Sequence, residues 1–211
     1  MSWRPLRATT RKLAILCAVL GLSPCPGAQA QSSRTAADLM DAVMWGKEPI
    51  GGPFALVDQN GRTRTERDFL GKLLLVYFGF TSCPDICPTE LLTIATTLDR
   101  LGPAAAGVQP LFITLDPERD TPDHLREYVS AFHPRLLGLT GSAEQIRKVA
   151  EAYRVYYVKV PIAGDSYTID HMGFVYLMGA DGRYLGFLPP GTPAEKMVAV
   201  VRPHLATAGE H

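Results

Sequence analysis

Apolar residues along the chain fall into continuous runs that alternate with stretches of helical periodicity. Residues 73–80 and 108–115 form two such runs, which are typical of strands that a sheet buries on both faces. Between them, apolar residues recur every three or four positions over 91–98, and this pattern stops at Gly102-Pro103. The pattern therefore predicts a strand, a loop that contains Cys83, a helix and a second strand.

The same alternation continues to the C-terminus. Further helices are predicted over 121–132, over 142–153 and from Thr192 onward. Further strands are predicted over 136–139, 155–158, 174–178 and 184–188. Asn60-Gly61 predicts a β-hairpin ahead of all these elements, and residues 180–183 predict another between the last two strands. This order predicts an α/β fold of the thioredoxin-like type, with a mixed central sheet flanked by helices and an added N-terminal β-hairpin.

The first 52 residues lack this alternation. Four basic residues precede an apolar run over 13–22, and Ala28-Gln29-Ala30 follows a Pro/Gly break, which is the layout of a secretory signal peptide. The run is about half as long as the ~20 residues that a spanning helix needs. Residues 1–30 are therefore predicted to be a cleaved signal peptide, with an uncleaved anchor as the alternative. Residues 31–52 are predicted to be a flexible tether and 53–211 the compact domain.

Charge argues against one class of function, and the cysteine content indicates which residues carry the chemistry. The chain has 21 basic and 21 acidic residues, so it lacks the basic excess that is typical of nucleic-acid-binding proteins. The leader predicts export to the periplasm, with the protein soluble or tethered to the outer face of the inner membrane. Cys17 and Cys25 leave with a cleaved leader. Cys83 and Cys87 are then the cysteines of the mature chain, in an oxidising compartment.

Cys83 and Cys87 stand where a predicted core strand meets a helix N-terminus. That end of a helix favours thiolate over thiol, and thiolate is the form that binds metal or attacks a disulfide. Residues four apart lie on one side of a helical turn, so both sulfurs can reach one ion or each other. A purely structural disulfide would close a very small loop and stabilise little. The pair therefore predicts metal or redox chemistry.

A metal site at these thiols needs a further ligand. Two soft thiolates favour copper(I), and an imidazole as third ligand also accommodates copper(II), whereas structural zinc would need four protein ligands. His171 immediately precedes the strand predicted over 174–178, which lies beside the cysteine loop in a thioredoxin-like fold. Cys83, Cys87 and His171 are therefore the candidate copper ligands, with Asp170 as a candidate to orient the ring or a plain loop residue. The other histidines are expected at the surface: His124, His133, His204 and His211.

Redox chemistry is the alternative use of the cysteine pair. Cycling between dithiol and disulfide would let the chain keep a partner's copper-ligand cysteines reduced, or signal a redox state without delivering metal. The three-residue spacing and Ser82 argue against a thioredoxin-type Trp-Cys-x-x-Cys reductase. Thioredoxin-fold peroxidases have Pro and Thr or Ser at the positions that Val76 and Phe80 occupy here, which argues against a peroxidase. The two uses are compatible, because copper binds only the reduced pair.

Taken together, these features resemble the Sco/SenC family of copper-binding cytochrome c oxidase assembly proteins, from about residue 50 to the C-terminus. The resemblance rests on residues 77–81, Cys83-Pro84-Asp85-Ile86-Cys87-Pro88, Asp116-Pro117-Glu118-Arg119-Asp120-Thr121-Pro122, Tyr153-Arg154-Val155, Asp170-His171 and residues 176–178. It implies copper held by Cys83, Cys87 and His171. It also implies delivery of copper to the binuclear centre of cytochrome c oxidase subunit II or another recipient, and contacts with other copper chaperones. A non-enzymatic copper chaperone is therefore favoured over a thiol-disulfide oxidoreductase.

The chain also departs from this family pattern. Ser82 stands where many members have a histidine, and a cleavable leader differs from the membrane anchor that is common in the family. Asp116 resembles a family position near the metal loop, but capping of the turn before Thr121 is an equal alternative.

Overall fold

The computed structural model describes residues 49–164 and 166–207. The predicted signal peptide, most of the predicted tether and His211 lie outside the described residues. No helix in the described part of the chain is long and apolar enough to span a membrane. Contacts with the domain begin before Pro53, because Ile50 is buried and the Gly51 N–H donates to the carbonyl of Ala152.

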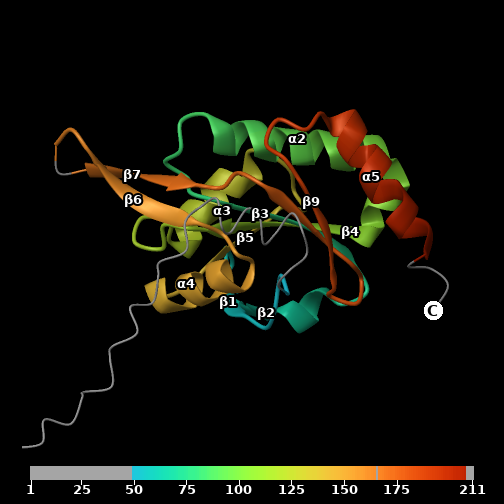
Figure 1. Cartoon of the computed structure of the whole chain (residues 1–211), viewed down its shortest axis with the longest axis horizontal. Helices are drawn as coiled ribbons and strands as arrows, with labels where there is room; N and C mark the ends of the chain where they lie inside the picture. The colour runs from blue at the N-terminus through green and yellow to red at the C-terminus, as the bar shows by residue number, and fades with distance from the viewer. Residues whose placement is uncertain (1–48, 165, 208–211) are drawn as a thin grey trace, which may run out of the picture. The chain divides into compact units, whose positions relative to one another are not determined.

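The centre of the domain is a seven-stranded mixed sheet, in the order β2-β1-β5-β4-β3-β8-β9 (Figure 1). Strands β3, β4 and β5 run parallel, while β1, β8 and β9 join antiparallel to their neighbours, and β1 and β2 form the predicted N-terminal hairpin. The strands are β1 (Ala55–Asp58), β2 (Thr63–Thr65), β3 (Leu73–Gly79), β4 (Val108–Thr114), β5 (Leu137–Thr140), β8 (Val175–Met178) and β9 (Tyr184–Leu188). The predicted thioredoxin-like α/β fold is confirmed.

Within residues 49–164 and 166–207, four helices and two short 3-10 segments accompany the sheet. Helices α2 and α5 pack against each other, and α3 packs along β5. The α4 helix has the predicted capping box, in which Ser142 and Gln145 bond each other's backbone N–H. The bounds are η1 (Glu66–Phe69), α2 (Ile86–Leu101), η2 (Gly102–Gly107), α3 (Pro122–Ser130), α4 (Ala143–Ala152) and α5 (Ala194–Thr207).

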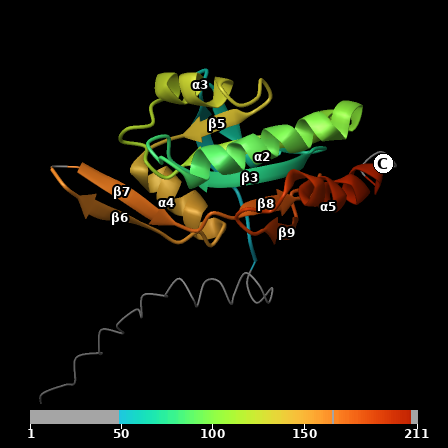
Figure 2. The same ribbon diagram turned by 90° about the horizontal axis from the view of Figure 1, so that it is seen from above.

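A separate β-hairpin, β6 (Tyr157–Ile162) and β7 (Ser166–His171), projects from the domain in both views (Figures 1 and 2). The sequence predicts a strand over 155–158 and a loop up to His171, so the existence of β7 is a correction. Of the β7 residues only Ile169 is buried, because the hairpin stands apart from the main sheet. A strand with one buried residue has no apolar run to reveal it.

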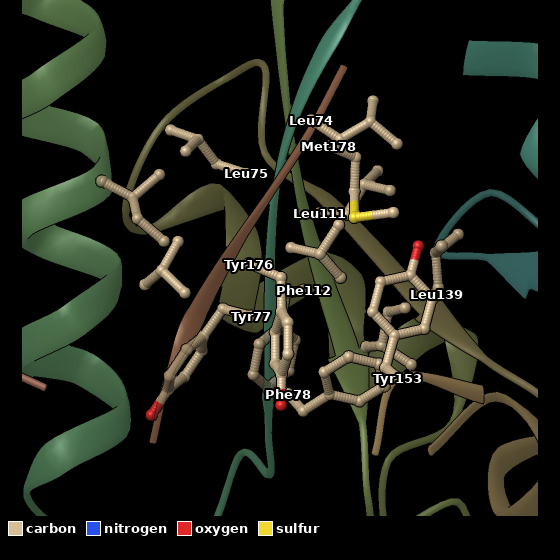
Figure 3. Packing of buried hydrophobic residues seen from close by; sticks show 14 of the residues in the cluster. Leu74, Leu75, Tyr77, Phe78, Leu111, Phe112, Leu139, Tyr153, Tyr176 and Met178 are labelled. Carbon is tan, nitrogen blue, oxygen red and sulfur yellow. The ribbon is translucent and has the colours of Figure 1, made fainter. Parts of the chain in front are cut away.

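The core is built on β3, in which all seven residues are buried. Consecutive side chains point to opposite faces of a sheet. Phe78 therefore contacts Tyr153 and Tyr176 on one face, at ring-centroid distances of 5.3 and 5.9 Å, while Tyr77 lies on the face toward α2 (Figure 3). Strand β3 therefore places the hydroxyl of Tyr77 next to α2, the helix that contains Cys87.

Candidate metal centre

The two cysteines lie at the carboxyl end of β3. The strand ends at Gly79 and α2 begins at Ile86, so Cys83 belongs to the connecting loop and Cys87 to the first turn of the helix. Cys83 is half-buried, Cys87 is fully buried, and both are free thiols. The loop lies at the carboxyl ends of the parallel strands β3 and β4. Many α/β proteins place their functional groups at the carboxyl ends of parallel strands.

His171 lies directly against the buried thiol. The Nε2 atom is 3.6 Å from Cys87 Sγ, although 84 residues separate the two in the chain. The ring packs edge-on against Tyr77 and Phe80, with centroids 6.4 and 5.9 Å away. The end of β7 and the start of α2 thus bring together a nitrogen and a sulfur of the predicted ligand set.

The surroundings of His171 select one tautomer of its ring. Its Nδ1 atom is 3.2 Å from the carbonyl oxygen of Met172, and a carbonyl can only accept, so Nδ1 carries the proton. His171 is half-buried, and this partial loss of water lowers the pKa of its ring, against smaller opposing effects of the Met172 carbonyl and the Asp170 charge. The ring is therefore neutral near pH 7. The Nε2 lone pair then faces Cys87. A backbone carbonyl orients the ring, while Asp170 is exposed beside it.

The Cys87 thiol keeps its proton in the metal-free protein. Burial raises the pKa of this thiol to about 12, although hydrogen bonds with the Phe80 backbone and the Tyr77 hydroxyl lower it. Tyr77 donates this hydroxyl to Cys87 Sγ at 3.6 Å. The sequence predicts that the helix N-terminus lowers the pKa of a cysteine here. At Cys87 that prediction is wrong, because burial raises the pKa of the thiol by more than the hydrogen bonds with Phe80 and Tyr77 lower it.

The three predicted ligands are not gathered into a finished site. Among the residues that the structure describes, no group of three or more His, Cys, Asp or Glu side chains is arranged to hold a metal ion. Cys87 and His171 are in contact, and Cys83 lies close enough to Cys87 to raise the pKa of that thiol. Two of the predicted ligands are therefore in contact, and the third lies in the adjacent loop.

The other histidines within 49–164 and 166–207 lie away from Cys87. His124 is exposed near the start of α3, with Nδ1 3.1 Å from the Arg119 carbonyl, and the Nδ1 of His133 accepts the backbone N–H of Arg135. His204 belongs to α5. Asp116 is fully buried and accepts the hydroxyl of Tyr167, whereas the side chain of Thr121 caps α3.

Two residues to which the sequence analysis assigns no role in the site also shape it. Tyr77 supplies the hydroxyl at Cys87, and Gly79 leaves the space that the sulfur occupies. A Cβ at position 79 would lie 2.9 Å from Cys87 Sγ and 3.0 Å from Phe112 Cε2. A lone glycine that ends a continuous apolar strand is the signal that indicates such a close approach.

Replacing Gly79 with alanine is expected to lower the free energy of unfolding by about 1–3 kcal/mol, because the methyl group overpacks the site. Chemical denaturation measures this loss. The matched control is Gly186→Ala in β9, where an added Cβ meets nothing within 4 Å, and that variant is expected to stay within about 1 kcal/mol of the wild type. Equal losses in both variants would show that the contact with Cys87 has no special cost.

The two thiols are expected to react at different rates. Cys83 is partly exposed, while Cys87 is buried and protonated, so iodoacetamide at pH 8 should modify Cys83 at least about tenfold faster. Mass spectrometry of peptides after timed alkylation measures both rates. Since burial raises the pKa of the Cys87 thiol, its rate of modification should still be rising at about pH 10. Comparable rates at pH 8 would contradict this description of the site.

The chain is similar to proteins of a known family. The SCO1/SenC family model matches residues 43–206. The mitochondrial SCO1 homolog 1 of Arabidopsis thaliana is 47% identical over 143 residues, which cover 67% of this chain and 43% of the relative. The chain thus spans less than half the length of that relative.

Solved structures of similar proteins share the fold. The copper-bound ScoI of Bradyrhizobium japonicum is 44% identical with a TM-score of 0.70, and the match covers 74% of this chain and 99% of that one. BsSco, a Sco family cytochrome c oxidase assembly protein in which a disulfide switch was identified, is 26% identical with a TM-score of 0.60, covering 75% and 96%. The chain belongs to the SCO1/SenC family.

Proposed function

We propose that this protein binds one copper ion through Cys83, Cys87 and His171 and delivers it during assembly of cytochrome c oxidase. The observation that carries the proposal is the 3.6 Å contact between Cys87 Sγ and His171 Nε2, beside a loop that holds a second thiol. Copper in the homologous ScoI structure supports the choice of metal. The binuclear copper centre of oxidase subunit II is the proposed recipient.

The donor set suits copper in either oxidation state. Thiolates favour copper(I), and a neutral imidazole is a ligand that copper(I) and copper(II) share. The Nδ1 contact with Met172 leaves the Nε2 lone pair free to bind the ion. Binding displaces the proton of Cys87, whose pKa is about 12, so the apparent copper affinity rises with pH. Cys83 completes the site when its loop moves toward the other two ligands.

The difference in burial between the two thiols suits transfer. A thiol of the recipient reaches copper from the solvent side, where the half-buried Cys83 lies. Cys87 and His171 hold the ion from the side of the protein interior. Copper then passes by stepwise exchange of ligands. We place this exchange in the periplasm, after export by the N-terminal segment, with the protein soluble or tethered to the outer face of the inner membrane.

The second candidate is a thiol-disulfide oxidoreductase, and the two free thiols together with the disulfide switch of BsSco favour it. In this role the Cys83 thiolate attacks a partner's disulfide and forms a mixed disulfide. The Cys87 thiolate then attacks Cys83, so the pair is oxidised by two electrons and the partner leaves as two thiols. Nothing in this exchange requires the imidazole of His171.

A transfer experiment separates the two functions. The full reduced chain, loaded with copper(I), is mixed with the copper-free soluble domain of an oxidase subunit II whose cysteines are either reduced or oxidised. The chaperone function predicts that copper moves to the reduced domain. Copper that stays on this chain, while the metal-free chain reduces the oxidised domain, would contradict delivery and support the oxidoreductase.

A further inference from the structure

The segment 115–121 joins β4 to α3 and contains two fully buried aspartates, Asp116 and Asp120. Buried carboxylates are costly unless specific partners satisfy them. The partners of these two come from the two different parts of the chain that carry the proposed copper ligands. We call residues 115–121 the bridging segment.

One end of the bridging segment holds the cysteine loop. Asp120 accepts the Thr81 N–H at 3.1 Å and the Thr81 hydroxyl at 2.6 Å, and it accepts the Thr114 hydroxyl at 2.5 Å. Thr81 stands two residues before Cys83. Asp120 can reach Thr81 because β3 and β4 are parallel neighbours that end side by side, with Gly79 paired to Thr114.

The other end holds the β6–β7 hairpin. Asp116 Oδ1 accepts the Tyr167 hydroxyl at 2.7 Å. Arg119 forms an ion pair with Asp116, donates to the Tyr167 carbonyl at 3.1 Å, and places its guanidinium carbon 4.0 Å from the centre of the Tyr167 ring. Glu118 also forms an ion pair of 2.7 Å with Lys159 on β6.

Tyr167 shares one face of β7 with the proposed ligand. Side chains two apart in a strand lie on the same face, so Tyr167, Ile169 and His171 form one row. Ile169 in the middle of the row is buried against the domain. The contacts of Tyr167 with Asp116 and Arg119 therefore join the domain to the face of β7 that also carries His171.

We propose that the bridging segment positions the two halves of the copper site relative to each other. Asp120 positions the cysteine loop through Thr81, and Asp116 positions His171 through Tyr167. Both are positioning residues, since neither touches Cys87 or His171. The proposal rests on the proposed copper site.

Tyr167→Phe tests the hairpin half, since it removes one hydroxyl and keeps the ring under Arg119. Copper(I) affinity of the full reduced chain, measured by competition with a chromophoric chelator, is expected to fall roughly 3- to 10-fold, less than the loss typical of groups that contact a metal ligand directly. The same substitution in a His171→Ala background is expected to cause no further loss. An equal loss in both backgrounds, or no loss in the wild type, would overturn the proposal.

Thr81→Val tests the cysteine half, with Thr81→Ser as the variant that keeps the hydroxyl. Thr81→Val is expected to weaken copper(I) binding in both backgrounds and to shift the Cys83–Cys87 disulfide equilibrium with glutathione, while Thr81→Ser and Tyr167→Phe leave that equilibrium unchanged. A disulfide equilibrium that Thr81→Val does not move would contradict the proposal.

The controls separate this proposal from the proposed function. Thermal unfolding of each variant shows whether it folds. If His171→Ala alone binds copper as tightly as the wild type, the ligand role of His171 fails and the positioning of His171 fails with it. If His171→Ala binds weakly but Tyr167→Phe binds normally, the copper site stands and only the bridging segment loses its role.

Discussion

Replacing His171 with alanine is expected to weaken copper binding by at least about 100-fold, while Cys83 and Cys87 still form a disulfide. The substitution removes the imidazole whose Nε2 atom lies 3.6 Å from Cys87 Sγ. Disulfide chemistry needs only the two sulfurs. Copper(I) competition titrations measure the first effect, and mass spectrometry after incubation with oxidised glutathione measures the second.

His204→Ala is the matched control, because His204 lies on α5, away from Cys87. We expect this variant to bind copper like the wild type. Equal affinities of His171→Ala and the wild type would remove His171 from the ligand set. A loss of disulfide formation in His171→Ala would show instead that the ring controls the thiols themselves.

Serine at Cys83 or at Cys87 is expected to abolish both copper binding and disulfide formation, because each function needs two sulfurs. The two variants should differ in stability. Cys87 is fully buried, so a serine hydroxyl there is expected to cost about 1–3 kcal/mol of unfolding free energy. Cys83→Ser, at a half-buried loop position, should stay within roughly 0.5 kcal/mol of the wild type. Copper titration and denaturant unfolding measure these effects.

Ser82→Ala provides the control for this pair of variants, since Ser82 is exposed beside Cys83. It should change neither copper affinity nor disulfide formation. One-to-one copper binding of wild-type strength by Cys83→Ser would exclude Cys83 from the site and leave Cys87 and His171 as its protein ligands.

Local patterns were sufficient to predict most of the fold. The continuous apolar run of β3 gave a central strand because a fully buried strand needs apolar residues on both faces. Ser142 and Gln145 gave the start of α4 because a capping box depends on residues only three apart. The strand β7 escaped prediction, since its sequence is mostly polar and its pairing partner β6 lies outside the main sheet.

The residues of the candidate site could be predicted from the sequence, but most of the contacts between them could not. Cys83, Cys87 and His171 could be chosen from residue chemistry and from their places next to predicted strands. The contacts that shape the site could not, because they join residues far apart in the chain. Tyr167 and Asp116 are 51 positions apart, and Thr81 and Asp120 are 39 apart. The raised pKa of Cys87 also depends on its burial, which three-dimensional packing decides.

X-ray absorption at the copper edge of the full copper-loaded chain tests the central claim most directly. With one copper per chain, the proposed site predicts two sulfur ligands and one nitrogen ligand, and it predicts that the nitrogen signal of an imidazole disappears in His171→Ala. A spectrum without sulfur ligands, or an imidazole signal that persists in His171→Ala, would contradict copper binding by Cys83, Cys87 and His171.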